Sequence, residues 1–308
     1  MNEAPRIPVH GRGRLASRLV AAATVLASFS ALAWADAVGF AGAGAMAWLL
    51  PVVLVVAAGS GREAVRLAAG GGIGLDAWIV PIGAAAIAAA PALVSRRLAA
   101  GDDPWSVVGP AAATSMAVVA AAFVAGVARY TGGGGHLVRT AGSIAAAVSI
   151  GLPMAFMVAL RLLPAGVVAG RFTALVPLVS LIAVVKAGDI AAYAVGSLVG
   201  RHRMAPALSP GKTWEGAAAS LAASLGVAWM VLERMGCGLE ARPCGGWPVF
   251  GVLVGVAGML GDLAESLVKR DLAAKDSGQM LGGMGGFLDL VDSLLLAAPV
   301  AWLLWALG

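Results

Sequence analysis

The chain has 308 residues, of which 60% are hydrophobic and only 12% are charged, and its formal net charge is +5 at pH 7. Its mean hydropathy of +0.91 excludes an ordinary water-soluble enzyme. Apolar runs of about 20 residues recur along the sequence, and a helix of that length crosses the hydrocarbon core of a bilayer.

Nine apolar runs are candidate transmembrane helices. We expect an interruption in the sixth run near Lys186–Asp189, because that run is longer than a bilayer requires. The 43 glycines permit close packing of membrane helices. The sequence therefore predicts an all-α polytopic membrane protein with about nine transmembrane helices. The runs lie near residues 15–35, 38–58, 76–95, 107–128, 138–160, 172–200, 216–233, 247–268 and 287–307.

The basic residues predict how these helices are oriented in the membrane. If the N-terminus is cytosolic, Arg62 and Arg66 fall in a cytosolic loop, as do most of the other basic residues between the runs. This bias follows the rule that basic residues concentrate on the cytosolic side. We therefore expect a multi-pass protein of the bacterial cytoplasmic (inner) membrane, with a cytosolic N-terminus and its catalytic loops on the cytosolic face. The outer loops would receive only Arg96, Arg97, Arg161, Arg171, Arg234 and Arg242.

The two halves of the chain differ in their charged residues. Residues 1–170 contain no intramembrane charge that the pattern identifies, so we expect an N-terminal transmembrane scaffold there. Residues 171–308 contain three charged motifs and are expected to form a C-terminal transmembrane catalytic region. The two cysteines, Cys237 and Cys244, fall in one predicted outer loop, where a disulfide and two free thiols are both open alternatives.

The first charged motif lies inside the sixth apolar run. Lys186, Asp189 and Tyr193 are spaced i, i+3 and i+7, so they share one face of a helix. Charged residues inside a membrane are costly and usually functional. The alternative is a self-neutralising Lys–Asp pair that only fixes helix packing.

The second motif, Ser209–Gly216, is expected to be a tight cytosolic loop before the seventh run. Lys212 supplies a mobile cation for a phosphate group. The hydroxyl groups of Ser209 and Thr213 are candidate phosphate contacts, although Thr213 is also a candidate N-cap for the next helix. The spacing of a P-loop is absent.

The third motif begins within the eighth run and continues into a loop. Asp262, Glu265 and Lys269 are spaced i, i+3 and i+7, which places them on one polar helix face. Lys275 and Asp276 follow in the loop. This stretch concentrates charge in a chain that is otherwise poor in it.

The end of the third motif combines glycines with two further carboxylates. The glycines of residues 282–286 let the backbone approach a phosphate closely. Asp289 and Asp292 are spaced i, i+3, and two carboxylates on one face repel each other unless a cation lies between them. Oxygen ligands of this kind suit Mg²⁺. The alternative is a set of helix-terminal charges on a solvated loop.

Together, the three motifs resemble the phosphatidate cytidylyltransferase (CDP-diacylglycerol synthase) family over about residues 180–295. The order and spacing of the blocks make this a specific resemblance. The matching residues are Asp189, Ala192, Tyr193 and Gly196; then Ser209, Pro210, Lys212, Thr213, Glu215 and Gly216; and then Gly261, Asp262, Leu263, Glu265, Ser266, Lys269, Arg270, Lys275, Asp276, Gly278, Gly285, Gly286, Leu288, Asp289, Asp292 and Ser293.

The resemblance implies a nucleotidyltransferase that converts CTP and phosphatidic acid to CDP-diacylglycerol and pyrophosphate in phospholipid biosynthesis. Its partners would be CTP, phosphatidic acid and the lipid bilayer, with no nucleic acid, and it would form a homodimer. We expect Asp276, Asp289 and Asp292 to hold Mg²⁺, with a second cation such as K⁺ left open. The expected catalytic residues are Lys212, Glu265, Lys269, Arg270, Lys275 and Asp276, and the expected substrate contacts are Asp189, Tyr193, Ser209, Thr213, Glu215, Asp262, Ser266, Gly285 and Gly286.

Two positions depart from the family pattern. Met284 stands where the family usually has His, and Leu290 stands where it usually has Arg. Both family residues are candidate phosphate contacts, so two alternatives remain: a non-catalytic relative, and an enzyme for a different lipid phosphate. A transporter is a weaker alternative, because no inverted repeat is visible.

Overall fold

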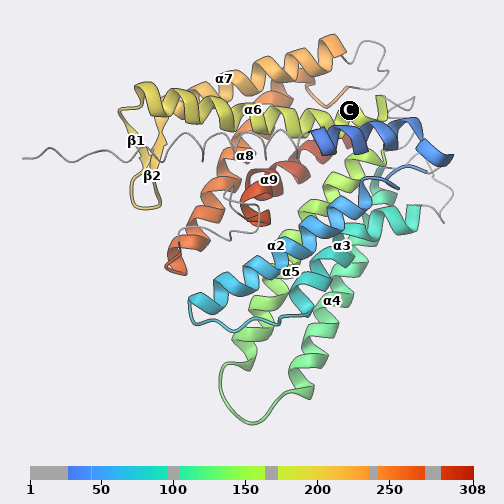
Figure 1. Ribbon diagram of the computed structural model, residues 1–308, viewed down its shortest axis with the longest axis vertical. Coiled ribbons are helices and arrows are strands. Elements are labelled where there is room, and N and C mark those ends of the chain that lie inside the picture. Colours follow the sequence, from blue (N-terminus) through green and yellow to red (C-terminus); the bar gives the residue numbers. More distant parts are fainter. Residues whose placement is uncertain (1–26, 43, 96–103, 164–172, 236–241, 275–285) are drawn as a thin grey trace, which may run out of the picture.

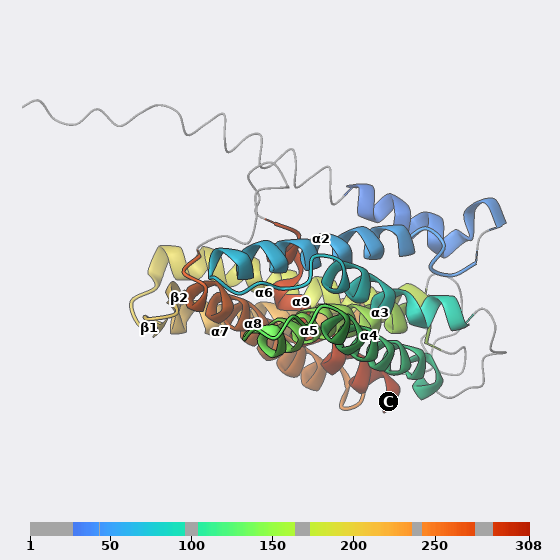
Figure 2. The ribbon, with the colours of Figure 1, turned by 90° about the horizontal axis from the view of Figure 1, so that it is seen from below.

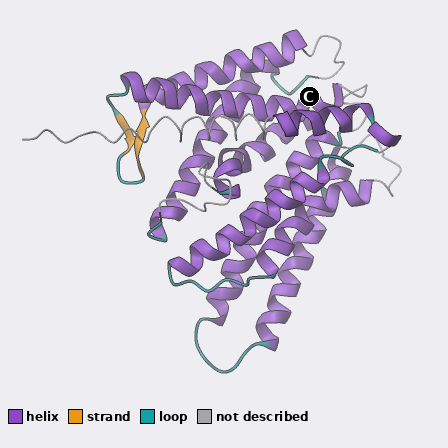
Figure 3. Ribbon diagram, viewed as in Figure 1, coloured by secondary structure: helices purple, strands orange, loops and turns teal. Residues whose placement is uncertain are grey.

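The computed structural model describes residues 27–42, 44–95, 104–163, 173–235, 242–274 and 286–308. Helices dominate these residues, as Figure 3 shows. After a helix over residues 27–38, the long helices are α2 (Leu50–Gly70), α3 (Ile79–Ser95), α4 (Gly109–Ala128), α5 (His136–Arg161), α6 (Val176–Val199), α7 (Trp214–Trp229), α8 (Gly246–Asp271) and α9 (Phe287–Ala306). The short elements are the 3-10 helices Phe40–Gly42, Pro104–Val107 and Thr173–Leu175, the π-helix Met230–Met235, and the strands β1 (Arg203–Ala205) and β2 (Ser209–Thr213).

Within the described residues, six helices are long and apolar enough to cross a membrane. The protein is therefore a helical, multi-pass membrane protein, and the expected number of about nine spans stays a prediction. The six candidates are Pro104–Ala128, His136–Arg161, Val176–Val199, Trp214–Arg234, Gly246–Asp271 and Phe287–Ala306, with Ile79–Val94 as a shorter apolar helix.

The helices form two groups that meet at α9. In Figures 1 and 2, α2, α3, α4 and α5 lie side by side, and α6, α7 and α8 form the second group. Helix α9 packs against α8 and α6 on one side and against α5 and α2 on the other. Its C-terminal half buries Trp302 and Trp305 completely in the main hydrophobic core. The N-terminal turns of α9, where Asp289 and Asp292 lie, are therefore held between both helix groups.

Three predicted elements differ in the structure. The run expected at 38–58 is instead helix α2, because Pro51 occupies the first turn, where proline is tolerated, and the helix continues to Gly70. Arg62 and Arg66 consequently lie in a helix and not in a loop. The sixth run forms α6, which is continuous through Lys186. The i, i+3 ion pair between Lys186 and Asp189 forms within the regular helix, so no interruption is needed.

The third difference concerns residues 209–213, which we expected to be a loop. They form β2, which pairs antiparallel with β1 in a short hairpin that projects beyond α6 and α7 in Figure 1. Tertiary contacts stabilise this pairing. The sequence pattern does not predict it, because the strands have only three and five residues. Cys237 lies outside the described residues, so the disulfide with Cys244 stays untested.

Candidate functional site

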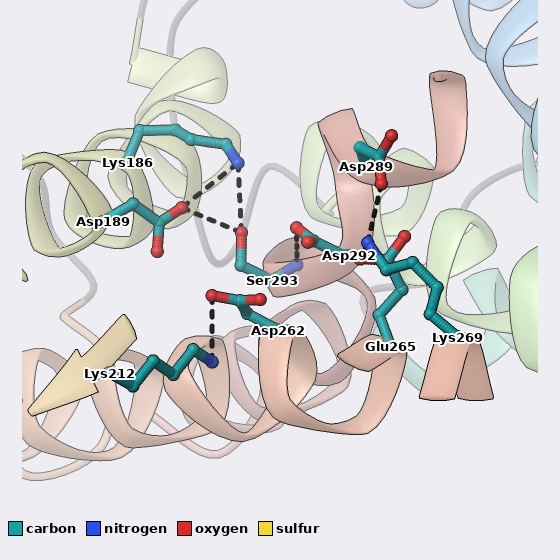
Figure 4. Close-up of polar contacts among 9 residues, drawn as sticks. All are labelled: Lys186, Asp189, Lys212, Asp262, Glu265, Lys269, Asp289, Asp292 and Ser293. Atoms are coloured by element: carbon teal, nitrogen blue, oxygen red, sulfur yellow. Dashed lines mark hydrogen bonds and ion pairs between the residues drawn. The ribbon is translucent and has the colours of Figure 1, made fainter. Parts of the chain in front are cut away.

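Three carboxylates from two helices converge between α8 and α9. One carboxylate oxygen from each of Asp262, Glu265 and Asp292 lies within 4.8 Å of the other two. Glu265 is buried, and its Oε1 atom has no hydrogen-bond partner among the residues that the structure describes. Three carboxylates so close together repel one another unless a cation lies between them. We call these three side chains the acidic cluster (Figure 4).

A glycine allows the two helices to approach closely enough to form this cluster. A Cβ atom at Gly261 would lie 2.6 Å from the carbonyl oxygen of Asp292 and 3.1 Å from the Cα atom of Ser293. Any larger residue would therefore push α8 and α9 apart. Because Asp262 and Glu265 follow directly on α8, this contact positions them beside Asp292.

Three lysines from three elements surround the acidic cluster. Lys212 Nζ, on β2, lies 2.9 Å from the carboxylate of Asp262. Lys269 Nζ, on α8, lies 2.5 Å from Glu265 Oε2 and 2.8 Å from Asp289 Oδ1. The third lysine, Lys186, comes from α6. Cations in this arrangement are well placed to neutralise a phosphate-bearing ligand.

Ser293 connects the third lysine to α9. Lys186 Nζ donates a hydrogen bond to Ser293 Oγ at 3.0 Å and lies 3.3 Å from Asp189 Oδ2. Ser293 Oγ in turn donates to Asp189 at 3.0 Å, and its backbone N–H donates to Asp292 Oδ1 at 2.5 Å. The Lys–Asp pair of α6 is thus linked to the acidic cluster through Ser293, whose hydroxyl group contacts the pair and whose backbone N–H contacts Asp292, as Figure 4 shows.

The β1–β2 hairpin is fixed by side chains of the second motif. Thr213 is the N-cap of α7, and its hydroxyl oxygen accepts a hydrogen bond from the Gly216 N–H at 3.1 Å. Glu215 accepts hydrogen bonds from the backbone N–H groups of Arg201 and His202. Arg270 Nε donates to the Leu208 carbonyl at 3.2 Å, which ties the hairpin tip to α8. These contacts direct Lys212 toward Asp262.

The three side chains expected to bind the metal have different surroundings in the structure. Asp292 belongs to the acidic cluster, whereas Asp289 faces Lys269 and accepts a hydrogen bond from the Gly286 N–H at 2.7 Å. Asp276 lies outside the described residues, as do Lys275 and Gly285.

The remaining expected contacts are spread around this centre. Asp262 lies inside the cluster, and Gly286 directly precedes α9. Ser209 begins β2, and Ser266 lies on α8. Tyr193 is 80% exposed on α6, although it shares a helical face with Asp189 by spacing. Their roles toward a substrate stay predictions.

The first half contains buried charges that the sequence pattern did not identify. Glu63 in α2 is completely buried, and the buried side chains of Asp36 and Arg161 form an ion pair at 2.9 Å. The signal for Glu63 was present, because Ser60, Glu63 and Leu67 are spaced i, i+3 and i+7 and form one buried face. The predicted span ended too early to include them.

The comparisons with known proteins agree with the motifs. The chain matches the model of the cytidylyltransferase family over residues 17–307. It is 46% identical over 132 residues to a phosphatidate cytidylyltransferase of Brucella suis biovar 1 (strain 1330), an alignment that covers 42% of this chain and 47% of that protein.

Two other relatives are less similar. A phosphatidate cytidylyltransferase of Mycobacterium tuberculosis (strain ATCC 25618 / H37Rv) is 42% identical over 137 residues, which cover 41% of this chain and 37% of that protein. The uncharacterized protein YnbB of Escherichia coli (strain K12) is 38% identical over 122 residues, which cover 39% of each chain. In all three alignments the matched segment spans less than half of the curated relative.

Proposed function

The chain belongs to the cytidylyltransferase family, and we infer from this that it transfers a cytidylyl group from CTP to phosphatidic acid, giving CDP-diacylglycerol and pyrophosphate. The relatives named phosphatidate cytidylyltransferase support this substrate pair. The single observation that carries the proposal is the acidic cluster on α8 and α9 with lysines from α6, β2 and α8 around it.

The acidic cluster fits a hard divalent cation. Its three ligands are all carboxylates, and Glu265 Oε1 has no hydrogen-bond partner among the described residues. Mg²⁺ prefers such oxygen ligands together with substrate phosphates. We propose that Asp262, Glu265 and Asp292 hold Mg²⁺, and that Asp276 and Asp289 contribute from the loop and the first turn of α9. When bound, the metal would neutralise charge on the CTP phosphates.

The proposed reaction requires no covalent intermediate on a side chain of the protein. An anionic oxygen of the lipid phosphate attacks the α-phosphorus of CTP, a new P–O bond forms, and the bond to the β-phosphate oxygen breaks with its electrons leaving on pyrophosphate. Because the lipid phosphate is already ionised at neutral pH, no side chain has to remove a proton. The work left to the protein is positioning and charge neutralisation. Lys212 and Lys269 lie beside the acidic cluster and are suited to that task.

The proposal also includes the roles expected for the other motif residues and for the substrates. Ser209 and Thr213 bind phosphate oxygens, and Arg270 and Lys275 add positive charge from the cytosolic side. The lipid enters from the bilayer of the bacterial inner membrane, and CTP arrives from the cytosol. K⁺ as a second cation and a homodimer follow only from the family resemblance.

A second candidate keeps the reaction but changes the lipid phosphate. One observation favours it: Leu290 is 38% exposed between Asp289 and Asp292, where the family usually has an arginine. An apolar side chain there removes one cation that phosphate groups would contact. The surface around Leu290 would then select a lipid phosphate with a different head group or a different acyl chain.

The decisive experiment uses the full chain in detergent. The purified protein is incubated with Mg²⁺, CTP labelled at its α-phosphate and a panel of lipid phosphates, and label is measured in the lipid phase. We expect label with phosphatidic acid, and its loss with EDTA or in Asp292→Asn. Asp271→Asn is the control, because Asp271 ends α8, the helix of Asp262 and Glu265, but is exposed. Label on another lipid only would establish the second candidate. Folded protein that labels none would contradict both and identify a non-catalytic relative.

A further inference from the structure

Glu63 is a completely buried carboxylate that the proposed reaction does not use. It lies in α2, in the half of the chain expected to be scaffold, yet its Oε2 atom accepts a hydrogen bond from the backbone N–H of Leu288 in α9 at 2.9 Å. Its Oε1 atom accepts no hydrogen bond from the residues that the structure describes. Burying a carboxylate is costly, so a role at this contact is required to explain it.

The contact replaces a missing helix cap. The first N–H groups of a helix have no partner within the helix, and a side chain at the N-cap position usually accepts one of them. In α9 the N-cap is Gly286, which has no side chain. Glu63 supplies the acceptor for Leu288 from another helix, and the positive end of the α9 dipole stabilises its charge.

The shape of the chain around Gly286 fits this role. A Cβ atom at Gly286 would collide with the carboxylate of Glu63. The backbone of Gly286 is extended, with φ at −96° and ψ at 179°, so its conformation by itself accepts any residue. One turn before Glu63, a Cβ atom at Gly59 would collide with the ring of Phe287. Helix α2 thus holds the first two residues of α9, one by packing and one by a hydrogen bond.

We propose that Glu63 is a positioning residue, which caps α9 from α2 and thereby sets the height and rotation of the helix that presents Asp289 to Lys269 and Asp292 to the acidic cluster. Asp289 and Asp292 follow the capped turn directly, so a loose first turn would let both carboxylates move. The link between this cap and activity rests on the proposed function, but the cap itself does not.

Two substitutions of Glu63 with side chains of similar volume distinguish the effect of its hydrogen-bond acceptor from the effect of its size. Glu63→Gln keeps an oxygen that accepts from the Leu288 N–H, whereas Glu63→Met removes it. We expect Glu63→Met to raise the Mg²⁺ concentration for half-maximal activity about fivefold, the equilibrium effect of losing a cap, and Glu63→Gln to stay within about twofold of the wild type. Asp36→Asn, a buried acid outside the contact with α9, should lower thermal stability without changing the Mg²⁺ requirement.

Gly286→Ala tests the same contact from the other side. It should resemble Glu63→Met, because the new methyl group displaces the carboxylate. In a Glu63→Ala background, where that space is open, Gly286→Ala should add little further effect. Such non-additivity is expected of residues that are in contact or share one network, and not of distant, independent sites. Full additivity of the two substitutions would contradict the proposal.

Amide hydrogen exchange provides a measurement that does not depend on catalysis. In detergent-solubilised full chain, the amides of residues 287–289 should exchange about fivefold faster in Glu63→Met than in the wild type or Glu63→Gln. Unchanged exchange in Glu63→Met, or exchange in Glu63→Gln as fast as in Glu63→Met, would overturn the cap. If the wild type transfers no label from CTP, the proposed function fails while this exchange result still decides the role of Glu63.

Discussion

Two groups of charges among the described residues, the Asp36–Arg161 pair and the acidic cluster with its neighbours, differ in how completely they are paired. In the first, Asp36 Oδ2 lies 2.9 Å from Arg161 Nε, and Asp36 Oδ1 accepts a hydrogen bond from the Trp48 N–H. Both oxygens of the carboxylate therefore have donors. A buried pair satisfied in this way holds helices in place and leaves no affinity for a ligand.

The second group is the acidic cluster with its neighbours, and it is not balanced. Figure 4 labels the carboxylates of Asp189, Asp262, Glu265, Asp289 and Asp292 and the lysines Lys186, Lys212 and Lys269, and Glu265 Oε1 has no hydrogen-bond partner among the described residues. An excess of partly buried negative charge is costly unless a cation joins it. Between these two groups, completeness of pairing separates the structural pair from the binding cluster, whereas Glu63, which caps α9, belongs to neither group.

The largest expected effect comes from removing one member of the incomplete group. Asp292→Asn should lower cytidylyl transfer by on the order of 1,000-fold, more than the 10–100-fold cost of removing a residue that only supports a metal ligand. Without metal, the same variant should be at least as stable as the wild type, since one repulsive charge is gone. Activity assays and thermal unfolding in EDTA measure the two effects. A metal-free Asp292→Asn that unfolds at a much lower temperature would show that the cluster is structural.

The opposite result is expected for the complete pair. Asp36→Asn leaves the buried guanidinium of Arg161 without its counter-charge, which typically destabilises a protein by about 3–5 kcal/mol. Activity per folded molecule should change less than about twofold, because the pair does not contact the acidic cluster. Unfolding in denaturant and the assay on folded protein test this. A large loss of turnover without a loss of stability would remove the distinction between the groups.

Sequence reasoning located the binding group better than the structural one. The spacing of Asp262, Glu265 and Lys269 placed them on one face because i, i+3 and i+7 positions are determined locally by the helix. Whether Asp289 or Asp262 joins Asp292 depends on how α8 and α9 rotate against each other at Gly261. That rotation is a long-range packing outcome, which spacing alone cannot predict.

For the helices as a whole, the sequence predicted their existence better than their ends and contacts. The apolar runs predicted the existence of most helices, since length and hydropathy are local properties, but the start of α2 was misplaced because residues 38–49 are equally apolar. Ser293 lay within the matched motif but was not assigned a role, because its partners Lys186 and Asp189 come from a different helix. Contacts between distant segments were the part that the sequence left open.

Metal binding should distinguish the two groups by stability alone. If the acidic cluster binds Mg²⁺, a concentration of 100 times the dissociation constant should stabilise the wild type by about 2.7 kcal/mol. Asp292→Asn should lose this gain, whereas Asp36→Asn should keep it despite its lower starting stability. Thermal unfolding across a Mg²⁺ titration measures both, with Na⁺ as the ionic-strength control. Equal gains in all three proteins would mean that Mg²⁺ acts elsewhere.

The smallest expected effect concerns an ion pair that is only half buried. Burial alone would raise the pKa of Asp76, but the backbone N–H groups of Ile79 and Trp78 and the guanidinium of Arg129 hold this pKa below its ordinary value. A carboxyl group with a lowered pKa stabilises the folded state above its unfolded pKa, and this contribution disappears as the pH falls through the folded pKa.

Stability should therefore decline below about pH 4 by no more than about 1 kcal/mol from this pair, because Arg129 is half exposed to solvent. Asp76→Asn should lack that part of the decline and should leave the Mg²⁺ requirement unchanged. Unfolding of both proteins between pH 3 and pH 7 makes the comparison. An identical pH profile in the variant would show that Asp76 is held by its backbone contacts equally well without its charge, and would place this pair outside both groups.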